Sequence, residues 1–244
     1  MQSSSGISVI IPAYNEERYL PPTLSALRRA ADEFREEFKQ PCEIIVCDNN
    51  STDRTCEVAR AHGARVVHHS ERNIAGVRNA GIRAANFALI VTVDADNLVP
   101  DHALRDIWIV MQSGRYVGGG VRIAVMSEQI VKRALVFCID RAILYGAGIS
   151  AGLFFFWKTD AEKIRGFPEQ LLVGEDTGFA LHLKKHGRKT RRKYKNLHSV
   201  VLRVSDRKKV TFGQGLKTVW HVLRQLAGRP TTREQLSFWY NPDR

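Results

Sequence analysis

Two pairs of carboxylates have the residue types and the spacing that could carry chemistry. Asp94 and Asp96 form a D-x-D in VTVDADN, directly after an apolar run, and Glu175 and Asp176 are adjacent in GEDTGFALHLKKHG. The first pair, if both side chains share one side of a strand end, could hold a divalent cation that leaves positions open for phosphate. The second pair stands at a predicted helix start, where acidic side chains suit the helix dipole, and one of them could also accept a substrate proton. Turn formation and helix electrostatics are the simpler interpretations of these pairs.

Other polar residues follow apolar runs nearer the start of the chain. Tyr14 and Glu16 lie in PAYNEE, Asp48 opens DNNSTD, and Arg78 lies in RNIAGVRNAG beside a glycine-bearing helix start. A tyrosine ring could flank a base, and a carboxylate could accept the imide N–H of a uracil or bind a ribose. A guanidinium pairs well with phosphate. Each of these residues also has an ordinary role in a loop, a helix cap or a surface helix.

The first half of the chain alternates short apolar runs with amphipathic stretches. This alternation predicts a mainly parallel sheet with helices on both faces, in which ligands bind beyond the carboxyl ends of the strands. Strands are predicted at 7–11, 43–47, 64–70 and 88–96, and helices at 20–38, 51–63, 75–85 and 100–114. In the second half, strands are predicted at 115–125, 152–157 and 199–204, and helices at 127–146, 159–167, 174–187 and 215–228.

This pattern predicts one α/β domain with a Rossmann-like twisted sheet and a smaller acceptor-side subregion. Its expected parts are a nucleotide-binding half over 1–114, an acceptor and catalytic half over 115–212, and a C-terminal amphipathic helix and tail over 213–244.

Charge and composition limit the partners and the compartment. The 244 residues carry a formal net charge of +12, much of it in KKHGRKTRRKYK at 184–195. Such a surface attracts nucleotides, nucleic acid or anionic membranes, but only Tyr194 interrupts the basic run as an aromatic, which argues against nucleic acid. The four cysteines have no zinc spacing, and no leader or long uncharged apolar segment is evident. We therefore expect a cytoplasmic protein, with peripheral contact to the cytoplasmic face of a membrane as an open alternative.

The motifs ISVIIPAYNEE, IIVCDNNSTDRT, RNIAGVRNAGI and VTVDADN occur in this order, followed by GISAGLFFFWKTDAEKIRGFPE and GEDTGFALHLKKHG. Together they resemble the family 2 glycosyltransferases of the GT-A fold, over about residues 7–190. The resemblance implies a nucleotide-sugar donor, most commonly a UDP-sugar, a Mn²⁺ or Mg²⁺ ion, and inversion at the anomeric carbon.

The resemblance also implies roles for single residues. Asp176 matches the catalytic base, with Glu175 as its acidic neighbour, and Asp96 matches a direct metal ligand. The expected donor-binding residues are Pro12, Ala13, Tyr14, Glu16, Asp48, Arg78, Asp94 and Gly152, with Asp94 also near the metal. His198 is a candidate metal ligand, although a structural histidine is the simpler interpretation, and Arg207 or Lys208 could contact the diphosphate.

Some features depart from the family's pattern or leave the function open. Asn49 stands in DNNSTD where the family often has an acidic residue, and no QxxRW of processive synthases follows GEDTG. A single addition to a lipid-linked or small-molecule acceptor is therefore expected, and a homodimer is possible. The alternatives are a sugar nucleotidyltransferase, although PAYNEERYL lacks the glycine-rich phosphate loop of that class, and an inactive homologue that binds nucleotides or polyanions.

Overall fold

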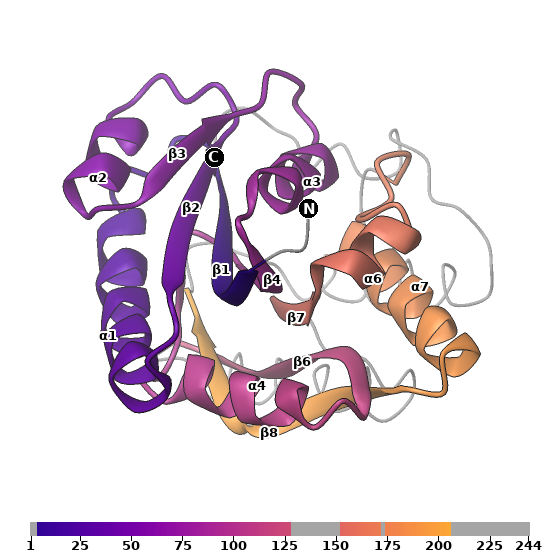
Figure 1. Cartoon of the computed structure of the whole chain (residues 1–244). Coiled ribbons are helices and arrows are strands. Elements are labelled where there is room, and N and C mark those ends of the chain that lie inside the picture. Colours follow the sequence, from indigo (N-terminus) through magenta and orange to yellow (C-terminus); the bar gives the residue numbers. More distant parts are fainter. Residues whose placement is uncertain (1–3, 128–151, 172–173, 206–244) are drawn as a thin grey trace.

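The protein is described by a computed structural model over residues 4–127, 152–171 and 174–205 (Figure 1). Its centre is an eight-stranded sheet with the order β3-β2-β1-β4-β7-β6-β8-β5. The strands are β1 (Ser4–Ala13), β2 (Cys42–Asp48), β3 (Arg65–His68), β4 (Phe87–Val93), β5 (Asn97–Leu98), β6 (Tyr116–Val125), β7 (Leu153–Trp157) and β8 (Lys193–Val204). The helices are α1 (Leu20–Phe38), α2 (Thr55–Ala61), α3 (Ile74–Ala84), α4 (Ala103–Gln112), α6 (Lys158–Lys163) and α7 (Glu175–Lys189).

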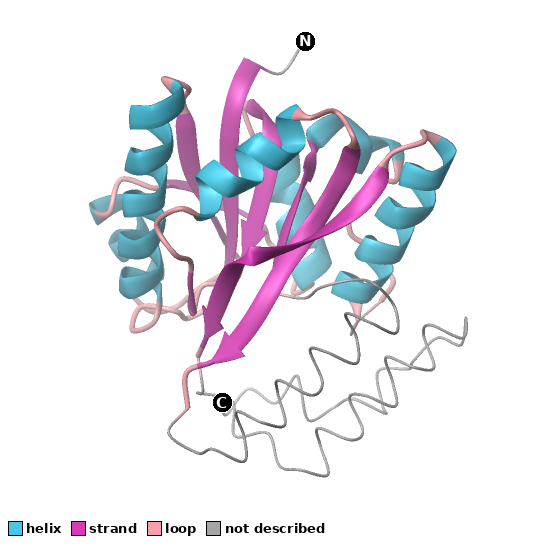
Figure 2. Ribbon diagram, turned by 90° about the horizontal axis from the view of Figure 1, so that it is seen from below, coloured by secondary structure: helices cyan, strands magenta, loops and turns pink. Residues whose placement is uncertain are grey.

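The first four strands in chain order form a parallel half-sheet. β1 pairs with β2 and β4, and β2 pairs with β3, all in parallel. β7 then joins this half to β6 through two antiparallel pairings, and β8 runs parallel to β6. The predicted mainly parallel sheet in a single α/β domain is therefore confirmed, and helices cover both of its faces (Figure 2).

Alternating side chains on the strands divide the core into two layers. On β1, Val9 and Ile11 belong to the layer that includes α1 and α4, while Ile10 belongs to the layer that includes α3 and α7. On β7, Phe155 and Phe154 separate in the same way. Both layers bury large apolar side chains, which is why these strands read as continuous apolar runs in the sequence.

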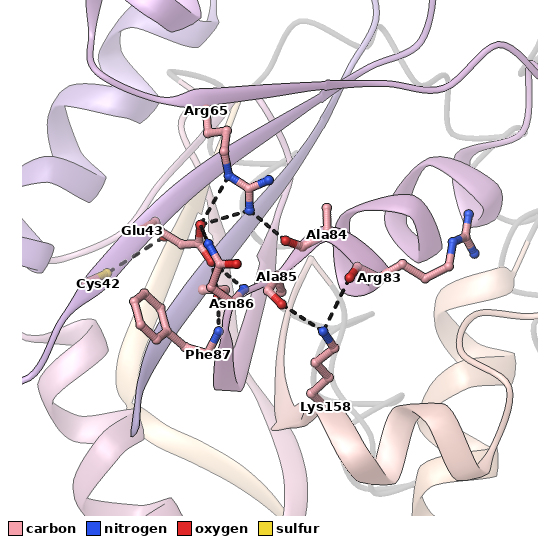
Figure 3. Close-up of polar contacts among 10 residues, drawn as sticks. Cys42, Glu43, Arg65, Arg83, Ala84, Ala85, Asn86, Phe87 and Lys158 are labelled. Atoms are coloured by element: carbon pink, nitrogen blue, oxygen red, sulfur yellow. Dashed lines mark hydrogen bonds and ion pairs between the residues drawn. The ribbon is translucent and has the colours of Figure 1, made fainter. Parts of the chain in front are cut away.

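Glu43 lies at the amino end of β2, whereas Asp48 lies at its carboxyl end. The Glu43 carboxylate contacts β1, β3 and the connection between α3 and β4. Its carboxylate accepts hydrogen bonds from Ser8 Oγ at 2.6 Å, from the Asn86 backbone N–H at 2.7 Å and from Arg65 at 2.9 Å (Figure 3). Lys158 donates to the carbonyls of Arg83 and Ala85 at the end of α3. These contacts fix the connection between α3 and β4, which leads to the D-x-D.

Several predicted boundaries change in the structure. β4 ends at Val93, so Asp94 and Asp96 lie in a turn and do not share one side of a pleat, contrary to the sequence prediction. The helix predicted from residue 51 begins at Thr55, because residues 51–53 instead bind the loop after β1. The helix predicted at 159–167 is shorter in the structure, because α6 begins at Lys158 and ends at Lys163.

The predicted helix at 215–228, the C-terminal part at 213–244 and nearly all of the predicted helix at 127–146 lie outside the described residues, as do Arg207 and Lys208. Among the described helices, none combines the length and the apolar character needed to cross a bilayer.

Candidate active site

The D-x-D lies in a turn that other elements hold in place. Thr23 of α1 donates its hydroxyl to the carbonyl of Ala95 at 2.8 Å. Asp94 Oδ1 accepts from Arg78 at 2.9 Å, and Asp96 Oδ2 accepts from Ser205 Oγ at 2.6 Å. The turn is therefore anchored from α1, from α3 and from the segment that follows β8.

Arg78 connects the D-x-D turn to the start of α7. Its side chain is 3% exposed, and its NH1 lies 3.0 Å from Glu175 Oε1 and 2.8 Å from Asp176 Oδ1. Burial alone would lower the pKa of Arg78, but the negative charges of Asp176, Asp94 and Glu175 outweigh burial and raise it. The guanidinium thus stays charged, and it gathers carboxylates that are 16 and 97 positions away in the chain.

Two stacked phenylalanine rings and the side-chain amide of Asn79 support the position of Arg78. The guanidinium lies 5.2 Å from the ring centroid of Phe167, which stacks on Phe179 of α7 with a centroid distance of 4.0 Å. Asn79 accepts from the Phe167 backbone N–H at 2.8 Å and donates to its carbonyl at 2.9 Å. Two consecutive residues of α3 therefore have different roles: Arg78 binds the carboxylates, and Asn79 fixes the loop that carries Phe167.

A second polar group lies at the carboxyl ends of the first three strands. Ala13, Asp48 and His68 are register partners across β1, β2 and β3. Asp48 is 2% exposed, accepts from the Ser51 backbone N–H at 3.3 Å, and lies 3.2 Å from His68 Nδ1. Burial and the charge of Asp48 both raise the pKa of the nearby Cys56 thiol. Pro12 precedes Ala13, so three predicted donor residues meet at this edge.

The loop after β1 brings the remaining predicted pocket residues to the same edge. Tyr14 is 40% exposed, and Arg72 lies over its ring at 4.8 Å and donates to its hydroxyl at 2.7 Å. Glu16 is 8% exposed, and its backbone N–H donates to Thr55 Oγ1 at 2.7 Å. The structure therefore places Tyr14 at the surface, while the loop around Glu16 is tied to the start of α2.

Gly152 lies beside the D-x-D turn, whereas His198 does not join it. Gly152 has a φ of +79°, and a Cβ there would lie 3.8 Å from Asn97 Nδ2. His198 is exposed in β8, where the pairing with β6 breaks between Leu197 and Val201. Ser205, seven positions further on, does contact Asp96. At about 3.3 Å per residue for a regular strand, that spacing takes His198 well away from the Asp96 contact.

Sequence reasoning missed several residues that shape the site. Thr23, Asn79 and Ser205 carry no local signal, because each acts on a segment distant in the chain. The sequence indicates Asn49 only as a lost charge, but its side-chain amide donates to the carbonyls of His69 and Glu71 at 2.8 and 2.7 Å. A carboxylate cannot donate these hydrogen bonds, so the amide holds the connection between β3 and α3.

The carboxylates of the D-x-D turn fit a hard divalent cation. Asp94 and Asp96 each offer oxygen atoms, while Asp94, Glu175 and Asp176 lie against the Arg78 guanidinium. The ligands that the D-x-D turn offers are oxygens, which Mg²⁺ and Mn²⁺ prefer, and few protein ligands leave room for phosphate.

The sequence profile described as Glycosyl transferase family 2 matches residues 8–179, which include Arg78, the D-x-D turn, Glu175 and Asp176 but not Ser205. The chain belongs to glycosyltransferase family 2. The prediction of a glycosyltransferase is thereby confirmed. An uncharacterized glycosyltransferase of Mycobacterium tuberculosis is 34% identical over 94 residues, which are 38% of each chain. A dolichyl-phosphate hexose transferase of Haloferax volcanii is 30% identical over 122 residues, half of each chain. The chain thus matches half or less of the length of these curated relatives.

Solved structures agree with the fold. A mannosyltransferase from Pyrobaculum calidifontis, in complex with GDP-Man and Mn²⁺, superposes with a TM-score of 0.67 at 18% identity. The match covers 94% of this chain and 66% of the mannosyltransferase. The described sheet and helices therefore form a GT-A fold, and this neighbour binds a nucleotide sugar together with a divalent metal.

Proposed function

We propose that this family 2 glycosyltransferase transfers a sugar from a nucleoside diphosphate donor, a UDP-sugar, to an acceptor hydroxyl with inversion, using Asp176 as the general base. The observation that carries this proposal is the position of Arg78, whose buried guanidinium contacts both Asp94 and Asp176. The Arg78 guanidinium therefore lies between two parts of the proposed site. One is the turn expected to bind the diphosphate, and the other is the carboxylate expected to take the proton. That proximity is what a single displacement requires.

Asp94 and Asp96 are the residues that would hold Mn²⁺ or Mg²⁺. A cation held there would neutralise the negative charge that develops on the leaving diphosphate. Ser205 and Thr23 fix the turn that presents the two carboxylates, through Asp96 Oδ2 and the Ala95 carbonyl. His198, exposed and distant along β8, has no part in this proposal.

Asp176 accepts the proton of the acceptor hydroxyl as its oxygen attacks the anomeric carbon. The bond from that carbon to the diphosphate oxygen breaks in the same displacement, and the configuration inverts. A carboxylate paired with a guanidinium is a poorer proton acceptor, so proton transfer requires the contact between Asp176 and Arg78 to loosen. Glu175, at 3.0 Å from Arg78, keeps the guanidinium in place while the Asp176–Arg78 contact loosens.

The donor's nucleoside is assigned to the edge formed by β1, β2 and β3. Pro12, Ala13, Tyr14, Glu16 and Asp48 lie along this edge, and we assign the buried Asp48 carboxylate to accept the imide N–H of uracil. Gly152, near Asn97, is assigned to the backbone that passes close to the sugar. Arg78 lies between the turn assigned to the diphosphate and Asp176, the proposed general base.

The scope of the reaction follows from the sequence and the relatives. We assign a single addition, because no QxxRW follows GEDTG, and a lipid-linked acceptor, with a small-molecule acceptor as the alternative. The lipid assignment is supported by the Haloferax relative, whose name specifies dolichyl phosphate. It also implies peripheral contact with the cytoplasmic face of a membrane.

Nucleotide-dependent thermal stabilisation tests this proposal. UDP, GDP, CDP and TDP are each added with and without Mn²⁺, because a ligand that binds only the folded state raises its apparent stability. We expect a metal-dependent shift with UDP that is lost in Asp96→Ala and kept in Asp101→Ala, whose residue pairs with Arg29 at the surface. A shift with GDP alone would change the donor class, and the absence of any shift would contradict an intact donor site.

A further inference from the structure

Three side chains of different chemistry meet at the carboxyl ends of β2 and β3. Asp48 offers a carboxylate oxygen, Cys56 in the first turn of α2 offers a sulfur, and His68 offers a ring nitrogen. These ligand atoms all lie within 4.8 Å of one another. In the part of the chain that the structure describes, no other group of three or more His, Cys, Asp or Glu side chains comes together in this way.

The backbone around the three residues is fixed by neighbouring strands. The Asn49 N–H donates to the Ala13 carbonyl at 2.9 Å, and the His69 N–H donates to the Asp48 carbonyl at 2.9 Å. Asp48 is 2% exposed, whereas the His68 side chain is 62% exposed. The group therefore has a rigid inner ligand and a solvent-facing outer one, and His68 lies on the path by which an ion would arrive.

The ligand set differs in kind from that of the D-x-D turn. A thiolate, an imidazole and a carboxylate together favour Zn²⁺, which binds sulfur at about 2.3 Å and nitrogen or oxygen at about 2.0–2.2 Å. These bond lengths require ligand atoms roughly 3–4 Å apart in a tetrahedral site, so small side-chain rotations close the present spacing. With three protein ligands, a fourth position stays open.

We propose that Asp48, Cys56 and His68 form a zinc site, separate from the Asp94–Asp96 turn, and that zinc bound there blocks binding of the donor's base. Binding releases the Cys56 proton to solvent and leaves the sulfur as a thiolate ligand. The blocking role rests on the proposed function, because it requires Asp48 to be the residue that receives the base. The zinc site itself does not depend on that assignment.

Cobalt titration of the full-length protein, stripped of metal with a chelator, tests the site. Co²⁺ in a tetrahedral site with a thiolate ligand gives visible d–d bands and a near-ultraviolet charge-transfer band. We expect both at one equivalent, with loss of the charge-transfer band in Cys56→Ser and at least tenfold weaker binding in His68→Gln. The matched control is His62→Gln, whose ring Nδ1 lies 2.9 Å from the Val58 carbonyl and which should leave the titration unchanged. A missing band in the wild type, or a band that persists in Cys56→Ser, overturns the site.

Competition with the nucleotide tests the blocking role. With Mn²⁺ present, Zn²⁺ at ten times its own Kd should weaken nucleotide binding about tenfold in the wild type by mass action and leave Cys56→Ser unaffected. Zinc inhibition that survives Cys56→Ser would place the zinc at the Asp94–Asp96 turn and contradict the proposal. A cobalt signal without any nucleotide binding would contradict the proposed function and the blocking role but leave the zinc site standing. Nucleotide binding without a cobalt signal would contradict the zinc site and leave the proposed function standing.

Discussion

At the scale of single residues, the buried charge of Arg78 is the feature on which the site depends. Replacing it with methionine leaves Asp94, Glu175 and Asp176 without their shared cation, and breaking a buried ion pair in this way costs about 3–5 kcal/mol. We therefore expect Arg78→Met to lower the free energy of unfolding by that amount in a urea titration. Arg29→Met is the matched control, because the Arg29–Asp101 pair is 60% and 50% exposed and is worth about 0–1 kcal/mol. Equal losses in the two variants would contradict a central role for the buried charge.

Gly166 offers a second test at the same scale. It has a φ of +67°, and a Cβ there would overlap Asn79 Oδ1, which accepts the Phe167 N–H. Gly114 has a φ of +68°, but no atom lies within 4 Å of the position that a Cβ would take there. Gly114→Ala should cost about 1–2 kcal/mol for the left-handed backbone alone. Gly166→Ala should cost more in the same denaturation experiment, because the Asn79 contact must also shift; similar losses would show that the contact is unimportant.

At the scale of elements, the Glu43 contacts hold β2, β3 and the connection from α3 to β4. Burial opposes ionisation of Glu43, but hydrogen bonds from Ser8, Asn86 and Arg65 outweigh it and lower the pKa from its usual 4.5. A carboxyl group with a lowered folded-state pKa stabilises the protein above its unfolded-state pKa and loses this contribution as pH falls through the folded value.

Glu43→Gln should therefore lower the free energy of unfolding by about 1–3 kcal/mol at neutral pH, the range for hydrogen bonds to a charged group. The difference from wild type should shrink as pH falls below 4.5 and through the lowered pKa of Glu43 in the folded protein, because the wild-type carboxyl group is then protonated. Glu57→Gln is the control, because that side chain is 68% exposed and should change stability by less than about 0.5 kcal/mol. Chemical denaturation across this pH range measures both, and a difference that does not depend on pH would refute the assignment.

The elements were largely predictable because periodicity is local. The apolar run at 7–11 and the helical face from Leu20 to Phe38 fall within β1 and α1, and the strand predicted at 115–125 matches β6 to one residue. The ends were less predictable. Ser51 accepts a hydrogen bond from the backbone N–H of Asn15, and Asp53 accepts from the N–H groups of both Glu17 and Thr55, the first residue of α2.

The site was predictable as residues but not as an arrangement. The motifs identified Arg78 and both carboxylate pairs as candidate site residues. The contact from Arg78 to Glu175, however, spans 97 positions and depends on how α3 and α7 pack. The prediction that Asp94 and Asp96 share one side of a strand was wrong for the same reason. Thr23 and Ser205, which are distant in the chain, donate hydrogen bonds to that turn. Local patterns identify chemical groups, whereas tertiary contacts decide which groups meet.

At the scale of the whole molecule, the basic run and the proposed active site lie at opposite ends of α7. Glu175 and Asp176 begin this 15-residue helix, which is about 22 Å long, and the basic residues occupy its end and the start of β8. Part of this charge is internal, because Arg192 contacts the buried Asp160 at 2.7 Å. The exposed remainder is therefore available to an anionic surface without entering the site.

We expect the protein to sediment with anionic vesicles at low salt and to be released as ionic strength rises. A variant with alanine at the exposed residues Lys185, Arg188, Lys189 and Lys193 should bind these vesicles more weakly, by up to about 1 kcal/mol per residue removed. Its nucleotide binding should match that of the wild type, because the replaced residues are distant from Asp176. Equal sedimentation of the two proteins would assign any membrane contact to another surface.

The central claim is that Asp176 takes the proton while the D-x-D turn binds the donor diphosphate. The most direct measurement is the release of nucleoside diphosphate from the nucleotide sugar by Asp176→Asn, alongside calorimetric nucleotide binding in the presence of Mn²⁺. The account predicts nucleotide affinity within about twofold of wild type and turnover lower by roughly 10²–10⁴-fold, the usual contribution of a general base. Turnover that stays near the wild-type rate, with the protein folded and the nucleotide bound, would contradict it.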